Sequence, residues 1–180
     1  MELKRYHDLL ASVRHDDNFH SITELVQPED LEVRNVAQVL SESPDFVSAC
    51  QGFVNSFTTY QREIGDYWTT PAEILRQRSG DCDDKAILLT SLLRNRIPAE
   101  KVFCAFGYWR VNGKRDGHMW VVMEGPNDAD RIIEATAGPG DSLRGHYTLE
   151  ALFNDVYAFA YPSGIMNFNL LSVALEKTSS

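Results

Sequence analysis

Residues 81–109, DCDDKAILLTSLLRNRIPAEKVFCAFGYW, contain the change of pattern on which the fold depends. Apolar residues at three- and four-residue steps predict a helix over residues 81–95. The Ile97-Pro98 pair ends this helix, because proline disfavours the helical conformation of the residue before it. From Lys101 onward the sequence is rich in valine and aromatic residues, which favour strands. The chain therefore changes from helix to sheet here, and the expected fold class is α+β.

Three short segments after Pro98 predict an antiparallel sheet. They are Lys101 to Trp109, His118 to Glu124 and Arg131 to Ala135. Turn-like stretches rich in glycine, asparagine and aspartate separate them. Because the run from Met119 to Met123 is apolar at both odd and even positions, we expect helices or a second layer on both faces of this sheet.

The residues before the quoted segment predict a helical lead-in over residues 1–65. Its first apolar stripe consists of Leu9, Leu10 and Val13. Two further helix starts follow, at Pro28 and at Pro44. The helix after Pro28 is expected to bury Leu31, Val36, Val39 and Leu40. The helix after Pro44 carries an apolar stripe that includes Cys50 and runs toward Gly65. A further short helix is expected over residues 72–77, capped by Thr70.

Composition and charge exclude several classes of protein. Hydrophobic residues make up 43% of the 180 residues and charged residues 24%, as in globular domains rather than disordered or fibrous chains. The formal charge of −9 argues against a uniformly basic nucleic-acid-binding surface and leaves room for a local basic patch. No apolar run approaches the roughly 20 residues of a membrane-spanning helix, and the first ten residues do not resemble a signal peptide. We expect a cytoplasmic protein with no nucleic-acid or membrane partner.

The three cysteines are candidates for different roles. Their odd number and the lack of a CxxC pair argue against a disulfide framework and a thiolate zinc site. Cys50, on a helix stripe, and Cys104, inside a predicted strand, are expected to be buried structural residues. Cys82 instead lies in the first turn of a helix, where unpaired backbone N–H groups and the helix dipole stabilise a thiolate.

Charges near Cys82 act in both directions. The flanking carboxylates of Asp81, Asp83 and Asp84 favour the neutral thiol, whereas a nearby imidazolium favours the thiolate. His118 begins a predicted strand, and the next strand carries Glu134. Side chains alternate along a strand, so His118 shares a face with Trp120, and Glu134 can reach one nitrogen of the imidazole. The other nitrogen can then face Cys82, which gives a nucleophile, a base and an orienting carboxylate.

These residues resemble the transglutaminase-like superfamily of cysteine-dependent acyl-transfer enzymes. The resemblance covers roughly residues 57–137 and rests on WTTPAEIL at 68–75, GDCDDKAILL at 80–89, SLLR at 91–94, IPA at 97–99, HMWVV at 118–122 and EAT at 134–136. It implies a papain-like or transglutaminase-like core with the nucleophile Cys82 at a helix N-terminus. It also implies His118 as general base and acid and Glu134 as the orienting group, although the family commonly has aspartate at the third position.

The resemblance further implies what the chain does. The expected reaction is acyl transfer from a peptide or amide carbonyl through a thioester, with hydrolysis preferred over transamidation and a peptide or protein as substrate. Trp68 and Gln61 are candidates for completing an oxyanion hole. We expect no cofactor and no metal, although in some bacterial protease relatives acids flanking the cysteine help to bind calcium. Residues 1–180 are expected to form one domain, in which 66–137 carry the motifs and 138–180 pack on the core.

Two other interpretations remain open. The first is a binding or scaffold module that keeps the fold without the chemistry, in which the apolar segment 147–168 blocks the cleft or contacts a partner. The second is a different cysteine–histidine class, such as a cell-wall peptidase, which the Glu134-Ala135-Thr136 and His118 strands fit less well. The oligomeric state is not indicated by the sequence.

Overall fold

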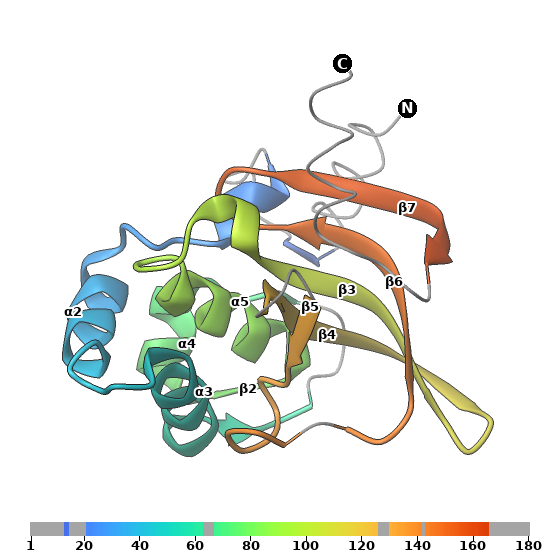
Figure 1. Ribbon diagram of the computed structural model, residues 1–180, viewed down its shortest axis with the longest axis horizontal. Helices are drawn as coiled ribbons and strands as arrows, with labels where there is room; N and C mark the ends of the chain where they lie inside the picture. The colour runs from blue at the N-terminus through green and yellow to red at the C-terminus, as the bar shows by residue number, and fades with distance from the viewer. Residues whose placement is uncertain (1–12, 15–20, 63–66, 126–129, 142, 166–180) are drawn as a thin grey trace.

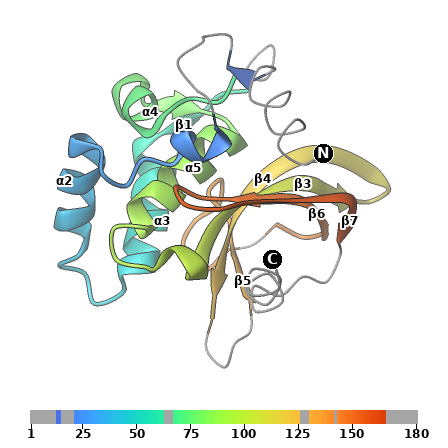
Figure 2. The same cartoon turned by 90° about the horizontal axis from the view of Figure 1, so that it is seen from above.

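Helices and strands form two layers, with the α-helices gathered on one side of an antiparallel sheet (Figure 1, Figure 2). The computed structural model describes residues 13–14, 21–62, 67–125, 130–141 and 143–165. The helical elements are η1 (Ile22–Leu25), α2 (Leu31–Leu40), α3 (Phe46–Phe57), α4 (Pro71–Gln77), α5 (Cys82–Leu93) and η2 (Ala99–Lys101). The strands are β1 (Thr59–Tyr60), β2 (Ser79–Gly80), β3 (Val102–Val111), β4 (Lys114–Glu124), β5 (Asp130–Ile133), β6 (His146–Phe153) and β7 (Ala158–Ile165). Within the described part of the chain, no helix is long and apolar enough to cross a membrane.

The main sheet has five antiparallel strands in the order β5-β4-β3-β6-β7. The three expected strands correspond to β3, β4 and β5, and the α+β class is confirmed. The sequence did not indicate β6 and β7, which extend the sheet from the other edge of β3. It also placed the start of β4 at His118, four residues too late. Asn112 and Gly113, with φ angles of 49° and 77°, form a tight turn, and pairing therefore continues to the Val111–Lys114 pair.

The main core lies between α5 and the sheet. Every residue of α5 after Cys82 is buried, because other helices surround it and β3 and β4 lie beneath it. The Cys104 thiol on β3 donates to the Thr90 hydroxyl on α5, at 3.0 Å. Cys104 and Cys50 are both buried in this core, as expected, and burial raises the pKa of each thiol to about 12.

A second apolar cluster covers the face of the sheet that the helices do not cover. Its buried members are Phe103, Ala105, Trp120, Val122, Leu149 and Leu152. Rings from Tyr157 and from Phe159 of β7 pack against Phe103, with centroid separations of 6.5 and 6.2 Å. The apolar residues at odd positions of β4 therefore pack in the main core, and those at even positions pack in this second cluster.

The prediction for α2 was wrong at two positions. Leu31 and Val39 are 71% and 68% exposed, whereas Val33 and Ala37, four residues apart, form the buried stripe. The helix's own apolar residues occur on most of its sides, so periodicity alone did not identify the buried side. The other two residues expected in the core, Val36 and Leu40, are half-buried.

The helix α3 also ends earlier than expected. It stops at Phe57, and the next residues extend to form β1, which pairs in parallel with β2 just before Cys82. The expected end at Gly65 lies outside the described residues, as do Leu9 and Leu10 of the first stripe, whereas Val13 is buried.

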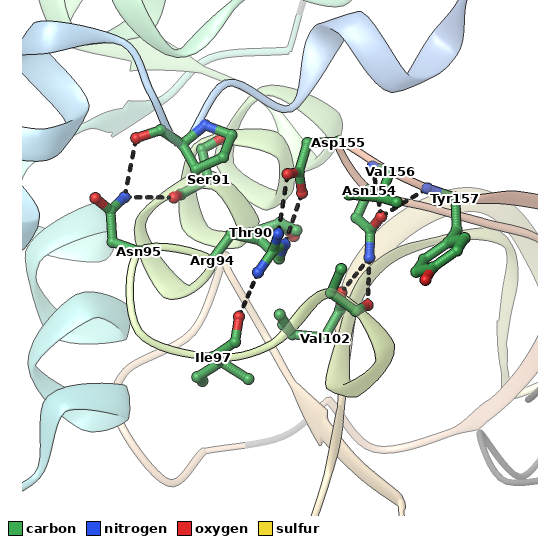
Figure 3. A network of polar contacts seen from close by, with 12 residues as sticks. Thr90, Ser91, Arg94, Asn95, Ile97, Val102, Asn154, Asp155, Val156 and Tyr157 are labelled. Atoms are coloured by element: carbon green, nitrogen blue, oxygen red, sulfur yellow. Dashed lines mark hydrogen bonds and ion pairs between the residues drawn. The ribbon is translucent and has the colours of Figure 1, made fainter.

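A polar network fixes the far end of α5 to the turn between β6 and β7 (Figure 3). Arg94 forms two bonds to the carboxylate of Asp155, at 2.6 and 3.0 Å. The buried amide of Asn154 donates to the carbonyls of Ala99 and Val102, at 2.6 and 2.9 Å. These contacts hold α5 in a fixed position relative to the sheet, which determines where its first residue, Cys82, meets β4.

Candidate active site

The N-terminus of α5 is anchored through one buried carboxylate. Asp84 accepts hydrogen bonds from the Thr69 backbone N–H and hydroxyl, at 2.8 and 2.7 Å, and from the Asp81 backbone N–H at 3.2 Å. Gly80 packs directly against it, since a Cβ at that position would lie 2.6 Å from Asp84 Oδ2. The first turn of α5 is therefore locked to the residues that lead into α4, where Thr70 caps the helix as predicted.

Cys82 is the first residue of α5, and its sulfur reaches the sheet. The thiol donates to Asp83 Oδ1 at 3.7 Å, and the backbone N–H of Met119 on β4 donates to the sulfur. Burial is the largest influence on the Cys82 thiol and raises its pKa, and the charge of Asp83 acts in the same direction. The backbone N–H of Met119 on β4 and that of Cys82 at the helix start lower the pKa, but they do not overcome this shift. The combined effect favours the neutral thiol over the thiolate.

The two aspartates beside Cys82 form a compact acidic group with the sulfur. Ligand atoms of Asp81, Cys82 and Asp83 all lie within 4.8 Å of one another. Burial, a hydrogen bond with Asp81 and the neighbouring carboxylate charges raise the pKa of Asp83 to about 10. Asp81 Oδ1 is buried and has no hydrogen-bond partner among the described residues. Carboxylate oxygens in such surroundings suit either a shared proton or a cation.

His118 and Glu134 lie in contact, at the end of the β4–β5 pairing. His118 Nε2 lies 3.1 and 3.3 Å from the two carboxylate oxygens of Glu134, which is fully buried. The last paired residues of these strands are Val121 and Ile133, and Glu134 follows directly. His118 also shares a face with Trp120, with the rings stacked at 6.0 Å. Because Nε2 faces Glu134, Nδ1 is the ring nitrogen left for other partners.

Three residues that support Glu134 were not assigned a role from the sequence. The Tyr147 hydroxyl on β6 donates to Oε1 at 2.5 Å, and the Thr136 hydroxyl donates to Oε2 at 3.3 Å. The Gln51 side chain of α3 donates to the Glu134 backbone carbonyl at 2.9 Å. Thr136 belongs to the Glu-Ala-Thr motif, but nothing in the sequence indicates that β6 and α3 approach this point.

A cleft of about 790 Å³ brings the predicted residues to one place. Its lining includes Cys82, Asp81 and Asp83 from α5 and its cap, His118 and Met119 from β4, and an aromatic group composed of Tyr60, Trp68, Phe106, Tyr108 and Trp109. Glu134 lies behind His118. Among the described residues, no hydrogen bond joins Cys82 to His118.

The two oxyanion-hole candidates have different positions. Trp68 is buried and lines the cleft. Gln61 is exposed and does not line it, whereas its neighbours Tyr60 and Arg62 do. Alternation along the extended segment explains this difference, since adjacent side chains point to opposite sides. The contribution of Gln61 is a backbone N–H that donates to Gly80 at 3.0 Å.

Comparison with known proteins adds evidence on the fold. No family model matches the sequence, and no curated protein matches it. Among solved structures, EGTA-treated LapG from Legionella pneumophila is similar, with a TM-score of 0.56 and 20% identity over 88% of this chain and 96% of that chain. Calcium-bound LapG from the same organism gives a TM-score of 0.55 and 15% identity over 98% of both chains. The likeness supports the transglutaminase-like α+β fold that the motifs suggested.

Proposed function

We propose that this protein is a cysteine-dependent acyl-transfer enzyme that hydrolyses peptide or amide bonds, with Cys82 as its nucleophile. One observation carries the proposal: the thiol at the start of α5 and the imidazole of His118 line the same cleft, and the buried Glu134 contacts that imidazole. LapG is a cysteine protease of the transglutaminase-like fold, which supports the same class of reaction. The substrate we propose is a peptide or protein.

The reaction divides into two proton-balanced halves. His118 takes the thiol proton while Glu134 holds the opposite side of the ring, and the sulfur then bonds to the substrate carbonyl carbon. The carbonyl oxygen gains charge near the Cys82 backbone N–H, with Trp68 as the candidate second donor. The C–N bond breaks as the imidazolium gives its proton to the leaving amine, which leaves a thioester. Water then attacks the thioester carbon while His118 accepts a proton from that water. The C–S bond breaks, the acid product leaves, and the imidazolium returns its proton to the Cys82 sulfur.

The preference of Cys82 for the neutral thiol determines at which step its proton moves to His118. Burial and Asp83 favour the thiol, so a standing thiolate–imidazolium pair is not the resting state that we propose. Proton transfer to His118 would instead accompany substrate binding, which brings the reacting groups together. The same observation favours the alternative of an inactive binding module, since Cys82 donates to Asp83 rather than to His118.

A divalent cation fits the acidic group beside the nucleophile in part. The carboxylates of Asp81 and Asp83 would hold it, and the unpartnered Oδ1 of Asp81 is the observation that favours it. Calcium takes six to eight oxygen ligands, so these two residues supply only part of a set. A bound cation would offset the negative charge beside the sulfur and so favour the thiolate. One of the LapG structures is calcium-bound, which makes calcium the ion to test.

The test that needs no substrate is alkylation by iodoacetamide, resolved by peptide mass for each cysteine across pH. We expect Cys82 to react faster than the buried Cys50 and Cys104, because it lines the cleft. In His118→Ala we expect Cys82 to react more slowly than in the native chain, because no imidazole then accepts the thiol proton as the sulfur attacks the reagent. The matched control is His146→Ala, which removes an exposed histidine that does not line the cleft. A Cys82 rate that is unchanged by His118→Ala would favour the inactive module. For a substrate found by screening peptide amides, Cys82→Ala should abolish hydrolysis.

A further inference from the structure

The tip of the β3–β4 hairpin is strongly basic, although the chain as a whole carries a charge of −9. Arg110 on β3 and Lys114 and Arg115 on β4 flank the Asn112-Gly113 turn, and all three are exposed. We call these three cations the basic hairpin. In Figure 1 the hairpin extends beyond the other strands of the sheet, so its tip is surrounded by solvent.

The arrangement of these cations opposes the stability of the sheet. Arg110 and Arg115 are direct cross-strand partners, and like charges in that position destabilise an antiparallel pair. Arg115 is partly compensated, because it stacks on Tyr108 at 3.4 Å and lies 4.0 Å from Glu150. No carboxylate among the described residues forms an ion pair with Arg110 or Lys114. A local conflict of this kind is expected where a surface serves function rather than folding.

The basic hairpin continues directly into the cleft. Tyr108 and Trp109 on β3, and Asp116 and Gly117 on β4, line the cleft and adjoin the three cations in sequence. The Trp109 indole N–H donates to the Arg144 carbonyl at 3.1 Å. The backbone of Arg144, a fourth exposed cation, therefore lies beside the hairpin. With Asp116 and Glu150 as the nearby carboxylates, these four cations give this end of the sheet a net charge of +2.

We propose that the basic hairpin binds an acidic stretch of the peptide substrate, so that the enzyme selects substrates with Asp or Glu near the scissile bond. This inference rests on the proposed function. Lys114 and His118 are four strand positions apart, or about 14 Å, and an extended peptide covers that distance in about four residues. The acidic residues are therefore expected about four positions from the scissile carbonyl.

Charge complementarity is the argument for this occupant. An acidic peptide meets unpaired cations at the hairpin and aromatic walls in the cleft, where backbone and small side chains can pack. A nucleic acid would also meet the cations, but the cleft beyond them carries the carboxylates of Asp81 and Asp116, which repel phosphates.

The test compares matched electrophilic peptides that alkylate Cys82. One pair is chloroacetyl-Gly-Ser-Gly-Glu-Glu-Glu-amide and its glutamine equivalent; the other carries the same stretch on the opposite side, as acetyl-Glu-Glu-Glu-Gly-Ser-Gly chloromethyl ketone and its glutamine equivalent. In each reaction the sulfur bonds to the methylene carbon and chloride leaves. In at least one pair we expect the glutamate peptide to react about tenfold faster at low salt, with the ratio falling toward one in about 0.5 M NaCl.

Two double variants separate the hairpin from overall charge. Arg110→Gln/Lys114→Gln should reduce the glutamate-to-glutamine rate ratio by at least about threefold. Arg34→Gln/Arg76→Gln removes the same charge from α2 and α4 and should keep the ratio of the native chain. Equal rates for both peptides of both pairs, or an equal loss in the two variants, would overturn the proposal.

A binding measurement distinguishes this failure from failure of the proposed function. Fluorescence anisotropy with a labelled Gly-Ser-Gly-Glu-Glu-Glu peptide lacking the electrophile reports docking without chemistry. Salt-sensitive binding that is weakened by Arg110→Gln/Lys114→Gln supports the hairpin surface even if Cys82 proves unreactive. Tighter binding of a single-stranded oligonucleotide of equal charge would overturn the assignment to an acidic peptide.

Discussion

The hydroxyl of Tyr147 offers a sharp test of how the buried carboxylate of Glu134 is held. In Tyr147→Phe the ring remains and keeps its packing against Trp120 and His118, at centroid separations of 4.9 and 6.3 Å. Only the 2.5 Å hydrogen bond to Glu134 Oε1 is lost. Burial and the adjacent carboxylate raise the pKa of Tyr147, so the phenol stays protonated and can donate at ordinary pH. The variant therefore isolates one donor.

The expected loss of stability follows from the charge and burial of the acceptor. A hydrogen bond to a charged group contributes about 1.5–3 kcal/mol, and Glu134 has no exposure through which water could replace it. We expect a decrease of about 2 kcal/mol in the free energy of unfolding, or about 4–8 °C in melting temperature for a chain of this length. The proposed function adds a second expectation, a slower alkylation of Cys82, because Glu134 would hold His118 less firmly.

Urea unfolding of the native chain and of matched variants provides the measurement. The matched control is Tyr157→Phe, which removes a tyrosine hydroxyl bonded to Glu100 at 3.0 Å on the exposed surface and should cost clearly less. Tyr147→Phe should also cost less in a Glu134→Gln background than in the native chain, since the charged acceptor is then absent. A loss for Tyr147→Phe no larger than that for Tyr157→Phe would refute the reasoning.

Three further predictions concern the start of α5. Gly80→Ala should lower the free energy of unfolding by about 1–3 kcal/mol in urea, because the new Cβ meets Asp84, whereas Gly117→Ala, with nothing within 4 Å, should change it little. The pKa of Asp83 is raised from 3.8 to about 10 on folding, so this carboxyl favours the folded state least at high pH, and its contribution declines as pH rises from about 4 toward 10. Asp83→Asn should therefore raise the free energy of unfolding above that of the native chain, and this increase should be larger at pH 8 than at pH 5 by at least about 1 kcal/mol. Equal increases at the two pH values would contradict this. Calcium at 100 times its dissociation constant should stabilise the native chain by about 2.7 kcal/mol in thermal unfolding, whereas magnesium should not. Calcium should have no effect on a variant that carries both Asp81→Asn and Asp83→Asn.

The parts of the fold that depend on local chemistry could be predicted from the sequence. The cap at Thr70, the helix α5 and the apolar run of β4 each depend on residues within a few positions of one another. The position of β6 depends instead on pairing with β3 some forty residues away, and its sequence contains no turn that fixes the register. On α2, apolar residues occur on several sides, so only the tertiary packing determines that Val33 is buried and Val39 is not.

The electrostatics of the site were less predictable than its geometry. Sequence position identified both influences on Cys82, the helix N-terminus and the flanking carboxylates, but their balance depends on burial. The depth at which α5 packs is set by contacts at its opposite end, such as Arg94 with Asp155. A helix start that is exposed would favour the thiolate, whereas this one is covered by β4 and favours the thiol. The tertiary structure therefore determines the charge state of a residue whose position the sequence identifies.

Glu134 illustrates how a departure from a motif can be accommodated by a residue outside it. With one methylene more than the aspartate common in the resembled family, its carboxylate reaches a point where donors from three places converge. These are His118 on β4, Tyr147 on β6 and Thr136 two residues further along the chain. A buried carboxylate with a single partner would incur a large desolvation penalty, whereas three partners offset it and fix the rotamer. The glutamate and Tyr147 are therefore best understood as a pair, so that Glu134→Asp would require a compensating change on β6 to restore the Tyr147 bond.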